Sequence, residues 1–391
     1  MSEYYDYMLP TVNFMGAGCV EVVGERCKIL GAEKVLLVTD NYLNSLESGP
    51  VQIVGDYLKK VGLEYVIFDG VTPNPKDKDV YAGLEIYEKE NCDMIVTVGG
   101  GSPHDCGKAI GVAATHDGDL YQDYAGIEKL ENETPPMVCV NTTAGTASEV
   151  TRHAVITDTS QTPNVKFVIV SWRNTPDVSI NDPELMIDKP AGLTAATGMD
   201  ALTHALETYV STGANPLTDA AALEAMKLIA ENLRNAVYNG QDIEARENMA
   251  NASVLSGFAF NNGGLGYVHA MAHQLGGFYD MPHGIANAIL LPYVEKFNLG
   301  AKLERFAKIA EIFGVNTEGM STREAAESSL EAIKQLAQDI GIPTSLSESK
   351  FDIKEEDFEE MAKYALEDGN AGTNPRKGTV EQVKDIFEDA M

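Results

Sequence analysis

Four of the seven histidines in this 391-residue chain lie between positions 204 and 283, and an aspartate precedes them at helical spacing. Asp200 and His204 are four residues apart in GMDALTHALE, and His269 and His273 are four apart in HAMAHQLGG. Each pair would share one face of a helix. His283 follows in MPHG, on a loop or at the start of a helix. For each of these histidines taken alone, a purely structural role is the alternative interpretation. Together, oxygen and imidazole groups without thiolates predict a site for Fe²⁺ or Zn²⁺.

A glycine-rich loop is the second chemical feature. The strand-like run MIVTV (94–98) leads into GGGSPHDCGKAIG (99–111), and a helix is predicted to begin near Pro103. Backbone N–H groups at such a strand-to-helix turn can hold an anion. The dinucleotide fingerprint would need a glycine where His104 stands, and the nucleotide P-loop would need Ser or Thr at Ala109. The loop therefore predicts a pyrophosphate site of neither standard type, with a tight structural turn as the alternative.

A polar loop follows the next strand-like run. In NTTAGTASE (141–149), Thr142, Thr143 and Thr146 supply hydroxyl groups after the run 137–141. Side chains at the carboxyl ends of parallel strands often line a ligand crevice, although threonines also serve as helix caps and turn formers. The loop is thus a second candidate for cofactor binding.

Asp40 ends the run VLLVTD. A carboxylate at this place can accept hydrogen bonds from a ribose 2′-hydroxyl and would repel a 2′-phosphate. This favours NAD over NADP, with capping of the next helix as the alternative role.

A nucleotide site combined with a metal site favours metal-assisted hydride transfer. The metal would bind and acidify an alcohol, and a nicotinamide would accept the hydride. A histidine beside the metal would relay the proton. A hydrolase is the weaker interpretation, because Ala270 stands where the protease motif HExxH requires glutamate.

Two halves with different periodicity must position these residues. The first half alternates helical patterns with β-branched runs, which predicts a parallel sheet covered by helices. The expected strands are 34–39, 64–68, 94–98 and 137–141, and the expected helices between them include 52–61 and 80–90. The runs 154–157 and 165–171 fit a hairpin or further strands. The second half has helical spacing throughout, at 196–210, 217–237, 243–260, 302–313, 323–340 and 355–366. We expect an α/β domain at 1–185 and an all-helical domain at 186–391, with the ligand site in the cleft between them.

Composition sets the class of protein. The hydrophobic fraction of 44% is typical of a globular protein, and no apolar run is long enough to cross a membrane. The net charge of −30 argues against nucleic acid and anionic membrane as partners. Five cysteines without a CxxC pair, and no signal peptide at the N-terminus, favour reduced thiols in the cytoplasm.

The motifs VGGGSPHDCGKAIG, NTTAGTASEVTRH, ATGMDALTHALE and GYVHAMAHQLGGFYDMPHG resemble those of the iron-containing (group III) alcohol dehydrogenases over essentially the whole chain. SPHDCGKAIG, SEVTRH and DGNAGTNPRKG are similar to the branch of that family that acts on 1,3-propanediol. The resemblance implies a Rossmann-like N-terminal domain and an all-α C-terminal domain, the dehydroquinate synthase-like fold. It also implies a homo-oligomer, from a dimer up to a larger assembly such as a decamer.

The resemblance also implies a role for individual residues. The implied metal ligands, usually for Fe²⁺, are Asp200, His204, His269 and His283. The implied cofactor contacts are Gly100, Gly101 and Ser102 at the pyrophosphate, Thr142, Thr143 and Thr146 along the site, Lys166 at the ribose, Asn74 on the adenosine side, and Asp40 as the group that selects NAD. His273 would lie beside the metal and relay a proton. In the lactaldehyde-reducing branch asparagine often replaces His153, which disfavours lactaldehyde as the substrate.

The predicted function is an NAD- and iron-dependent alcohol dehydrogenase for small primary alcohols and aldehydes, with 1,3-propanediol and 3-hydroxypropionaldehyde as the first choice. A broad-range ethanol, butanol or methanol dehydrogenase is the alternative within this class. A metal- and NAD-dependent sugar-phosphate lyase is the alternative from another class. It is disfavoured because residues 196–284 hold only three basic side chains, Lys227, Arg234 and Arg246, all outside the metal motifs.

Overall fold

A computed structural model describes residues 5–161 and 164–391. The chain forms two compact units. One unit is Leu9–Lys189, and the other joins Pro190–Met391 to the described residues 5–8. The division lies four residues beyond the expected position at 185, and the first residues described group with the second unit instead of the first.

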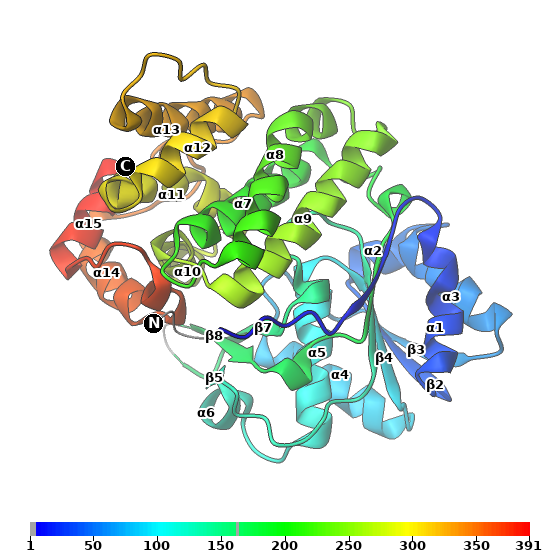
Figure 1. Ribbon diagram of the computed structural model, residues 1–391. Helices are drawn as coiled ribbons and strands as arrows, with labels where there is room; N and C mark the ends of the chain where they lie inside the picture. The colour runs from blue at the N-terminus through cyan, green and yellow to red at the C-terminus, as the bar shows by residue number, and fades with distance from the viewer. Residues whose placement is uncertain (1–4, 162–163) are drawn as a thin grey trace. The chain divides into compact units, whose positions relative to one another are not determined.

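The unit Leu9–Lys189 is built on a six-stranded parallel sheet in the order β1-β9-β6-β4-β2-β3 (Figure 1). Its strands are β1 Val12–Met15, β2 Lys34–Val38, β3 Glu64–Phe68, β4 Met94–Gly99, β6 Met137–Asn141 and β9 Val178–Asn181. A three-stranded sheet in the order β5-β8-β7 accompanies it. Its strands are β5 Gly126–Ile127, β7 His153–Asp158 and β8 Val165–Val170. β7 and β8 pair antiparallel, as a hairpin would.

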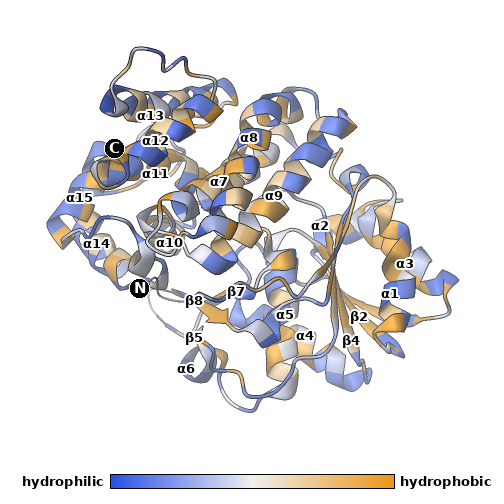
Figure 2. Cartoon of the chain, viewed as in Figure 1, coloured by the Kyte–Doolittle hydropathy of each residue, from blue (hydrophilic) through white to orange (hydrophobic). Residues whose placement is uncertain are grey.

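Helices cover both faces of the six-stranded sheet, because each central strand is apolar on both sides. β2 directs Leu36 into one buried cluster, with Ile110, and Leu37 into another, with Val54. The strands β2 and β4 accordingly lie at the hydrophobic end of the colour scale in Figure 2. The helices of this unit are α1 Val23–Ile29, α2 Asn41–Ser45, α3 Pro50–Lys60, α4 Asp77–Lys89, α5 Gly101–Thr115 and α6 Leu120–Tyr124.

The second unit is helical over its described residues, and α7, α8 and α9 pack side by side within it (Figure 1). Its helices are α7 Ala191–Val210, α8 Pro216–Tyr238, α9 Ile243–Gly263, α10 Tyr267–Tyr279, α11 His283–Asn298, α12 Leu303–Ile312, α13 Thr322–Asp339, α14 Phe358–Glu367 and α15 Val380–Asp389. Local signals fix several starts: Asn215 and Ser321 each form a capping box, which satisfies N–H groups of the first turn. Among the described residues, no helix is long and apolar enough to cross a membrane.

The expected elements are present with small shifts at their ends. α7 begins at Ala191, five residues before the expected start, and α5 begins at Gly101, ahead of Pro103. The strands β1, β5 and β9 and the helices α1, α2, α6 and α15 were not expected from the sequence.

Candidate functional site

Three predicted cofactor segments follow neighbouring strands of the six-stranded sheet. β2, β4 and β6 are parallel and adjacent, so their carboxyl ends meet at one edge. Asp40 follows β2, the GGGS loop follows β4, and Thr142 follows β6. Open α/β sheets commonly bind ligands at this edge.

The GGGS loop packs directly on the threonine loop. A Cβ on Gly100 would lie 2.7 Å from Thr143 Oγ1, and one on Gly101 would lie 2.8 Å from Thr146 Cγ2. The two glycines are therefore needed for the loops to approach each other. Thr142 N also donates to Gly99 O at 2.9 Å.

The same loop leaves the start of α5 open to a ligand. Gly100 is the N-cap of the helix and supplies no side-chain hydrogen bond to its first turn, where Gly101 and Ser102 lie. The N–H groups of a first turn and the helix dipole suit an anion. The site thus fits the pyrophosphate of a dinucleotide.

His104 explains why the standard fingerprint is absent. It stands where that fingerprint has its last glycine, and it is fully buried, with Nδ1 2.7 Å from Thr97 Oγ1 on β4. Burial lowers the pKa of His104 to about 3, and the Lys108 charge adds to the shift. The neutral imidazole therefore joins α5 to β4 where other folds bring a glycine against the strand.

Lys108 anchors the segment that follows the threonine loop. The Nζ of this fully buried lysine lies 2.6 Å from Ser148 O, 2.9 Å from Ser148 Oγ and 2.8 Å from the carbonyl oxygens of both Thr151 and His153, so its three hydrogens are shared among four acceptors. Burial lowers the pKa of Lys108, whereas the Asp105 carboxylate opposes that shift. Lys108 stands in the run GGGSPHDCGKAIG, but its role as an anchor was not predicted from the sequence.

Asn74 and Lys166, both predicted cofactor residues, contact each other. Lys166 Nζ on β8 donates to Asn74 Oδ1 at 2.9 Å, and Asn74 has a left-handed backbone with φ of 51°. Asp40, in turn, accepts a hydrogen bond from Leu43 N at 2.9 Å and caps α2. Asp40 therefore does cap the next helix, as the alternative role predicted, and it uses only its Oδ1 atom to do so.

The predicted metal residues meet in the helical unit. Ligand atoms of Asp200, His269 and His283 lie within 4.8 Å of one another. His269 Nε2 is 3.8 Å and His283 Nε2 is 3.6 Å from Asp200 Oδ1. His204 is outside this group of three, and its ring stacks on His269, with centroids 4.5 Å apart. α7 supplies Asp200 and His204, whereas α10 and α11 supply the other two histidines.

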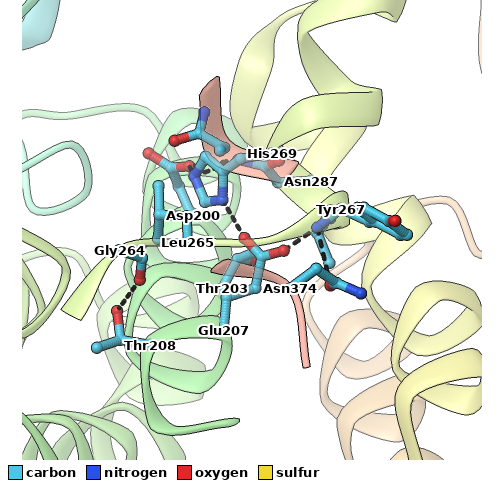
Figure 3. Close-up of polar contacts among 12 residues, drawn as sticks. Asp200, Thr203, Glu207, Thr208, Gly264, Leu265, Tyr267, His269, Asn287 and Asn374 are labelled. Carbon is cyan, nitrogen blue, oxygen red and sulfur yellow. Dashed lines mark hydrogen bonds and ion pairs between the residues drawn. The ribbon is translucent and has the colours of Figure 1, made fainter. Parts of the chain in front are cut away.

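Asn287, which the sequence did not single out, lies at the centre of this cluster. Its Nδ2 is 2.7 Å from Asp200 Oδ1, 3.2 Å from His269 Nε2 and 3.0 Å from His283 Nε2 (Figure 3 shows it beside the first two). It lies one helical turn after His283, a spacing that would have placed it on the same face. One amide carries two N–H hydrogens, so it cannot donate to three acceptor atoms at once.

Burial dominates the electrostatics of the cluster. Burial lowers the pKa of His269 well below its usual range, and the neighbouring histidines add to the effect. Its imidazole is therefore neutral and keeps a lone pair for a ligand bond. Burial also raises the pKa of Asp200, partly offset by His204 and by the Asn287 hydrogen bond.

His273 lies beside the cluster but is not one of its three members. Its ring stacks on that of His283, with centroids 5.4 Å apart. Its Nδ1 is 2.7 Å from Asp368 Oδ2. Burial raises the pKa of Asp368, but the charge and hydrogen bond of His273 outweigh that effect and leave the pKa below its usual value. Asp368 was missed in the sequence because it is 95 residues away from its partner.

Comparison with known proteins identifies the family to which this chain belongs. Residues 10–183 match the family model described as iron-containing alcohol dehydrogenase, and residues 194–391 match that of the Fe-containing alcohol dehydrogenase family, C-terminal. The chain belongs to the iron-containing alcohol dehydrogenase family. It is an oxidoreductase with the fold that the motifs implied.

Two curated relatives of this dehydrogenase match over almost its full length. The chain is 62% identical to the 1,3-propanediol dehydrogenase of Citrobacter freundii, covering 99% of each chain. It is 48% identical to the NAD-dependent methanol dehydrogenase of Bacillus methanolicus, covering 99% of this chain and all of the relative. A crystal structure of 1,3-propanediol oxidoreductase superposes with a TM-score of 0.96 at 61% identity, with both chains fully covered.

An iron-containing dehydrogenase requires a divalent cation, and the residues present fit one. The converging carboxylate and imidazoles supply oxygen and nitrogen donors without thiolate, which suit Fe²⁺ and also Zn²⁺. Family membership also decides against the sugar-phosphate lyase considered above.

Proposed function

We propose that this dehydrogenase uses NAD to interconvert small primary alcohols and aldehydes, and that 1,3-propanediol and 3-hydroxypropionaldehyde are its best substrate pair. The observation that carries the proposal is the 62% identity, over 99% of both chains, to the 1,3-propanediol dehydrogenase of Citrobacter freundii. A broader range is the second candidate, because the relative from Bacillus methanolicus is named for methanol.

Asp200, His204, His269 and His283 would hold Fe²⁺, with Zn²⁺ as a possible substitute. Three of the four converge within 4.8 Å, and His204 lies against His269 through ring stacking. When bound, the cation acts as a Lewis acid toward an alcohol or carbonyl oxygen, and NAD takes or gives the hydride. Anaerobically purified protein should therefore contain a divalent metal, and full activity of a metal-free preparation would contradict the assignment.

His273 would move the proton of the reaction. Its Nδ1 is held by Asp368 Oδ2 at 2.7 Å, which leaves Nε2 to exchange a proton with substrate or water. Stacking on His283 places it next to a proposed ligand while keeping it out of the converging group.

The cofactor would lie along the carboxyl edge of the parallel sheet. Gly100, Gly101 and Ser102 would hold its pyrophosphate at the start of α5. Thr142, Thr143 and Thr146 would line the site. Lys166 and Asn74, which are already hydrogen-bonded to each other, would contact the ribose and adenosine side, and Asp40 would select NAD.

A panel of aldehydes tests the substrate. With NADH and Fe²⁺, kcat/KM should be highest for 3-hydroxypropionaldehyde, compared with acetaldehyde, butyraldehyde and lactaldehyde. A higher value for acetaldehyde or butyraldehyde would establish the broad-range alternative. Failure to reduce any of the four would refute the proposal.

We also propose that the enzyme is a cytoplasmic homo-oligomer, a dimer or a larger assembly such as a decamer. The location rests on the five cysteines, which include no CxxC pair. The assembly rests on the family resemblance alone, and light scattering of the purified enzyme tests it. A monomer in solution would contradict it.

A further inference from the structure

A buried carboxylate that the proposed mechanism does not use lies directly behind one of the metal ligands. Glu207 is on α7 and is 2% exposed. Its Oε2 is 2.5 Å from His269 Nδ1, on the side of the ring away from Asp200 (Figure 3). Spacing puts Glu207 seven residues after Asp200, so both project from the same face of α7.

The start of α10 holds this carboxylate in place. Gly266, the N-cap of α10, offers no side chain to the first turn. Glu207 Oε1 accepts a hydrogen bond from Val268 N at 2.7 Å instead, so a residue of α7 caps α10. A negative group at a helix start is also favoured by the helix dipole. With Oε1 fixed in this way, Oε2 faces His269.

Close packing leaves the carboxylate little freedom. A Cβ on Gly266 would lie 2.9 Å from Glu207 Oε1 and 2.7 Å from Asn374 Oδ1, so any larger residue there would displace one of these side chains.

The contact decides which nitrogen of His269 is available to a cation. A carboxylate that accepts from Nδ1–H leaves the lone pair on Nε2. Nε2 is the atom that faces Asp200 Oδ1, at 3.8 Å, and Asn287 Nδ2, at 3.2 Å. Partners of this kind fix the tautomer and the ring orientation of a ligating histidine and raise its basicity.

We propose that Glu207 is a positioning residue of the metal centre: it fixes the Nδ1–H tautomer and the orientation of His269, and so sets the affinity of the site for a divalent cation. The inference rests on the proposed metal site and deepens it. Glu207 contacts neither substrate nor cofactor in this role, and it acts through His269 alone.

Glu207→Gln is the variant that isolates this role. The glutamine Oε1 can still accept from Val268 N, which keeps the cap of α10, but its amide N–H₂ would face His269 Nδ1. That donor favours the opposite tautomer, with the proton on Nε2, where the cation should bind. Glu149→Gln is the matched control, because Glu149 is also fully buried and belongs to the unit Leu9–Lys189, whereas every proposed ligand belongs to the helical unit.

The experiment measures Co²⁺ binding to the metal-free full-length protein by titration calorimetry, which does not depend on turnover. Wild type and Glu149→Gln should bind alike, and Glu207→Gln should bind about 10–100-fold more weakly. Equal binding by all three proteins would overturn the role of Glu207 and leave the metal site standing. Failure of the wild type to bind would overturn the proposed site itself.

A second measurement holds even if Glu207→Gln does not fold. In metal-free wild type with ¹⁵N-labelled histidine, long-range ¹H–¹⁵N correlation spectra should show His269 protonated at Nδ1. A proton on Nε2 in the wild type would refute the proposal.

Discussion

Replacing Asp40 tests whether its charge selects NAD. Asp40 follows β2 at the carboxyl edge of the sheet, and Oδ1 caps α2 by accepting from Leu43 N at 2.9 Å. Its substitution could therefore act through the charge or through the cap. Asp40→Asn separates the two effects, because asparagine caps a helix as well as aspartate does but carries no charge. Asp40→Gly removes both.

The size of the effect follows from Coulomb's law. A 2′-phosphate held about 4 Å from the carboxylate would be repelled by about 1 kcal/mol in bulk water and about 4 kcal/mol at the effective dielectric constant of 20 that suits a protein surface. Since about 1.4 kcal/mol is a factor of ten, removal of the charge should improve kcat/KM for NADP relative to NAD by about 5-fold to 10³-fold. The half-buried position of Asp40 favours a value between these limits.

The assay compares kcat/KM for NAD and NADP in wild type and both variants. Asp40→Asn and Asp40→Gly should shift the ratio toward NADP by similar factors. An unchanged ratio in both would remove Asp40 from cofactor selection. A shift in Asp40→Gly alone would assign the effect to the lost cap and contradict the electrostatic argument.

Three further changes test other parts of the molecule. His273→Ala should keep its metal and lose about 10²–10⁴-fold in kcat, with a smaller loss for Asp368→Asn; loss of metal or an unimpaired rate would refute the relay. Lys108→Met should cost about 3–5 kcal/mol in urea unfolding, because four oxygens lose a buried ammonium, and an unshifted midpoint would contradict its role as an anchor. Burial raises the pKa of Glu149 from 4.5 to about 7, so the folded protein holds this proton more tightly than the unfolded chain does. The resulting stabilisation of the folded state is complete below pH 4.5, and about 3 kcal/mol of it is lost as the pH rises through 7. Between pH 4.5 and pH 8, the free energy of unfolding should therefore change less in Glu149→Gln than in the wild type, and chemical denaturation at both pH values measures this.

Elements with strong local signals could be predicted from the sequence. β3 has the expected bounds because EYVIF is a short β-branched and aromatic run, and α9 begins at the expected Ile243. β1 and β9 have four residues each, and they become strands only because β9 pairs with β1 on one side and β6 on the other. The pairing of β1 with β9 joins segments more than 160 residues apart in sequence, so no local pattern reports it.

Spacing also predicted the members of the metal cluster better than it predicted the residues that hold them in place. Asp368 and Lys108 act on partners that only the fold brings near, so their roles could not be found locally. Asn287 and Glu207 differ, because each lies at helical spacing from a predicted ligand, four residues after His283 and seven after Asp200.

One face of α7 carries a residue that a search for metal ligands alone does not find. Asp200, His204 and Glu207 occupy positions i, i+4 and i+7 of one helix, and all three are at most 5% exposed. A carboxylate is rarely buried unless it has a partner. A third buried polar group on a stripe that already carries two proposed ligands therefore predicts a partner among the remaining ligands. In this fold that partner is His269, which α10 brings against Glu207.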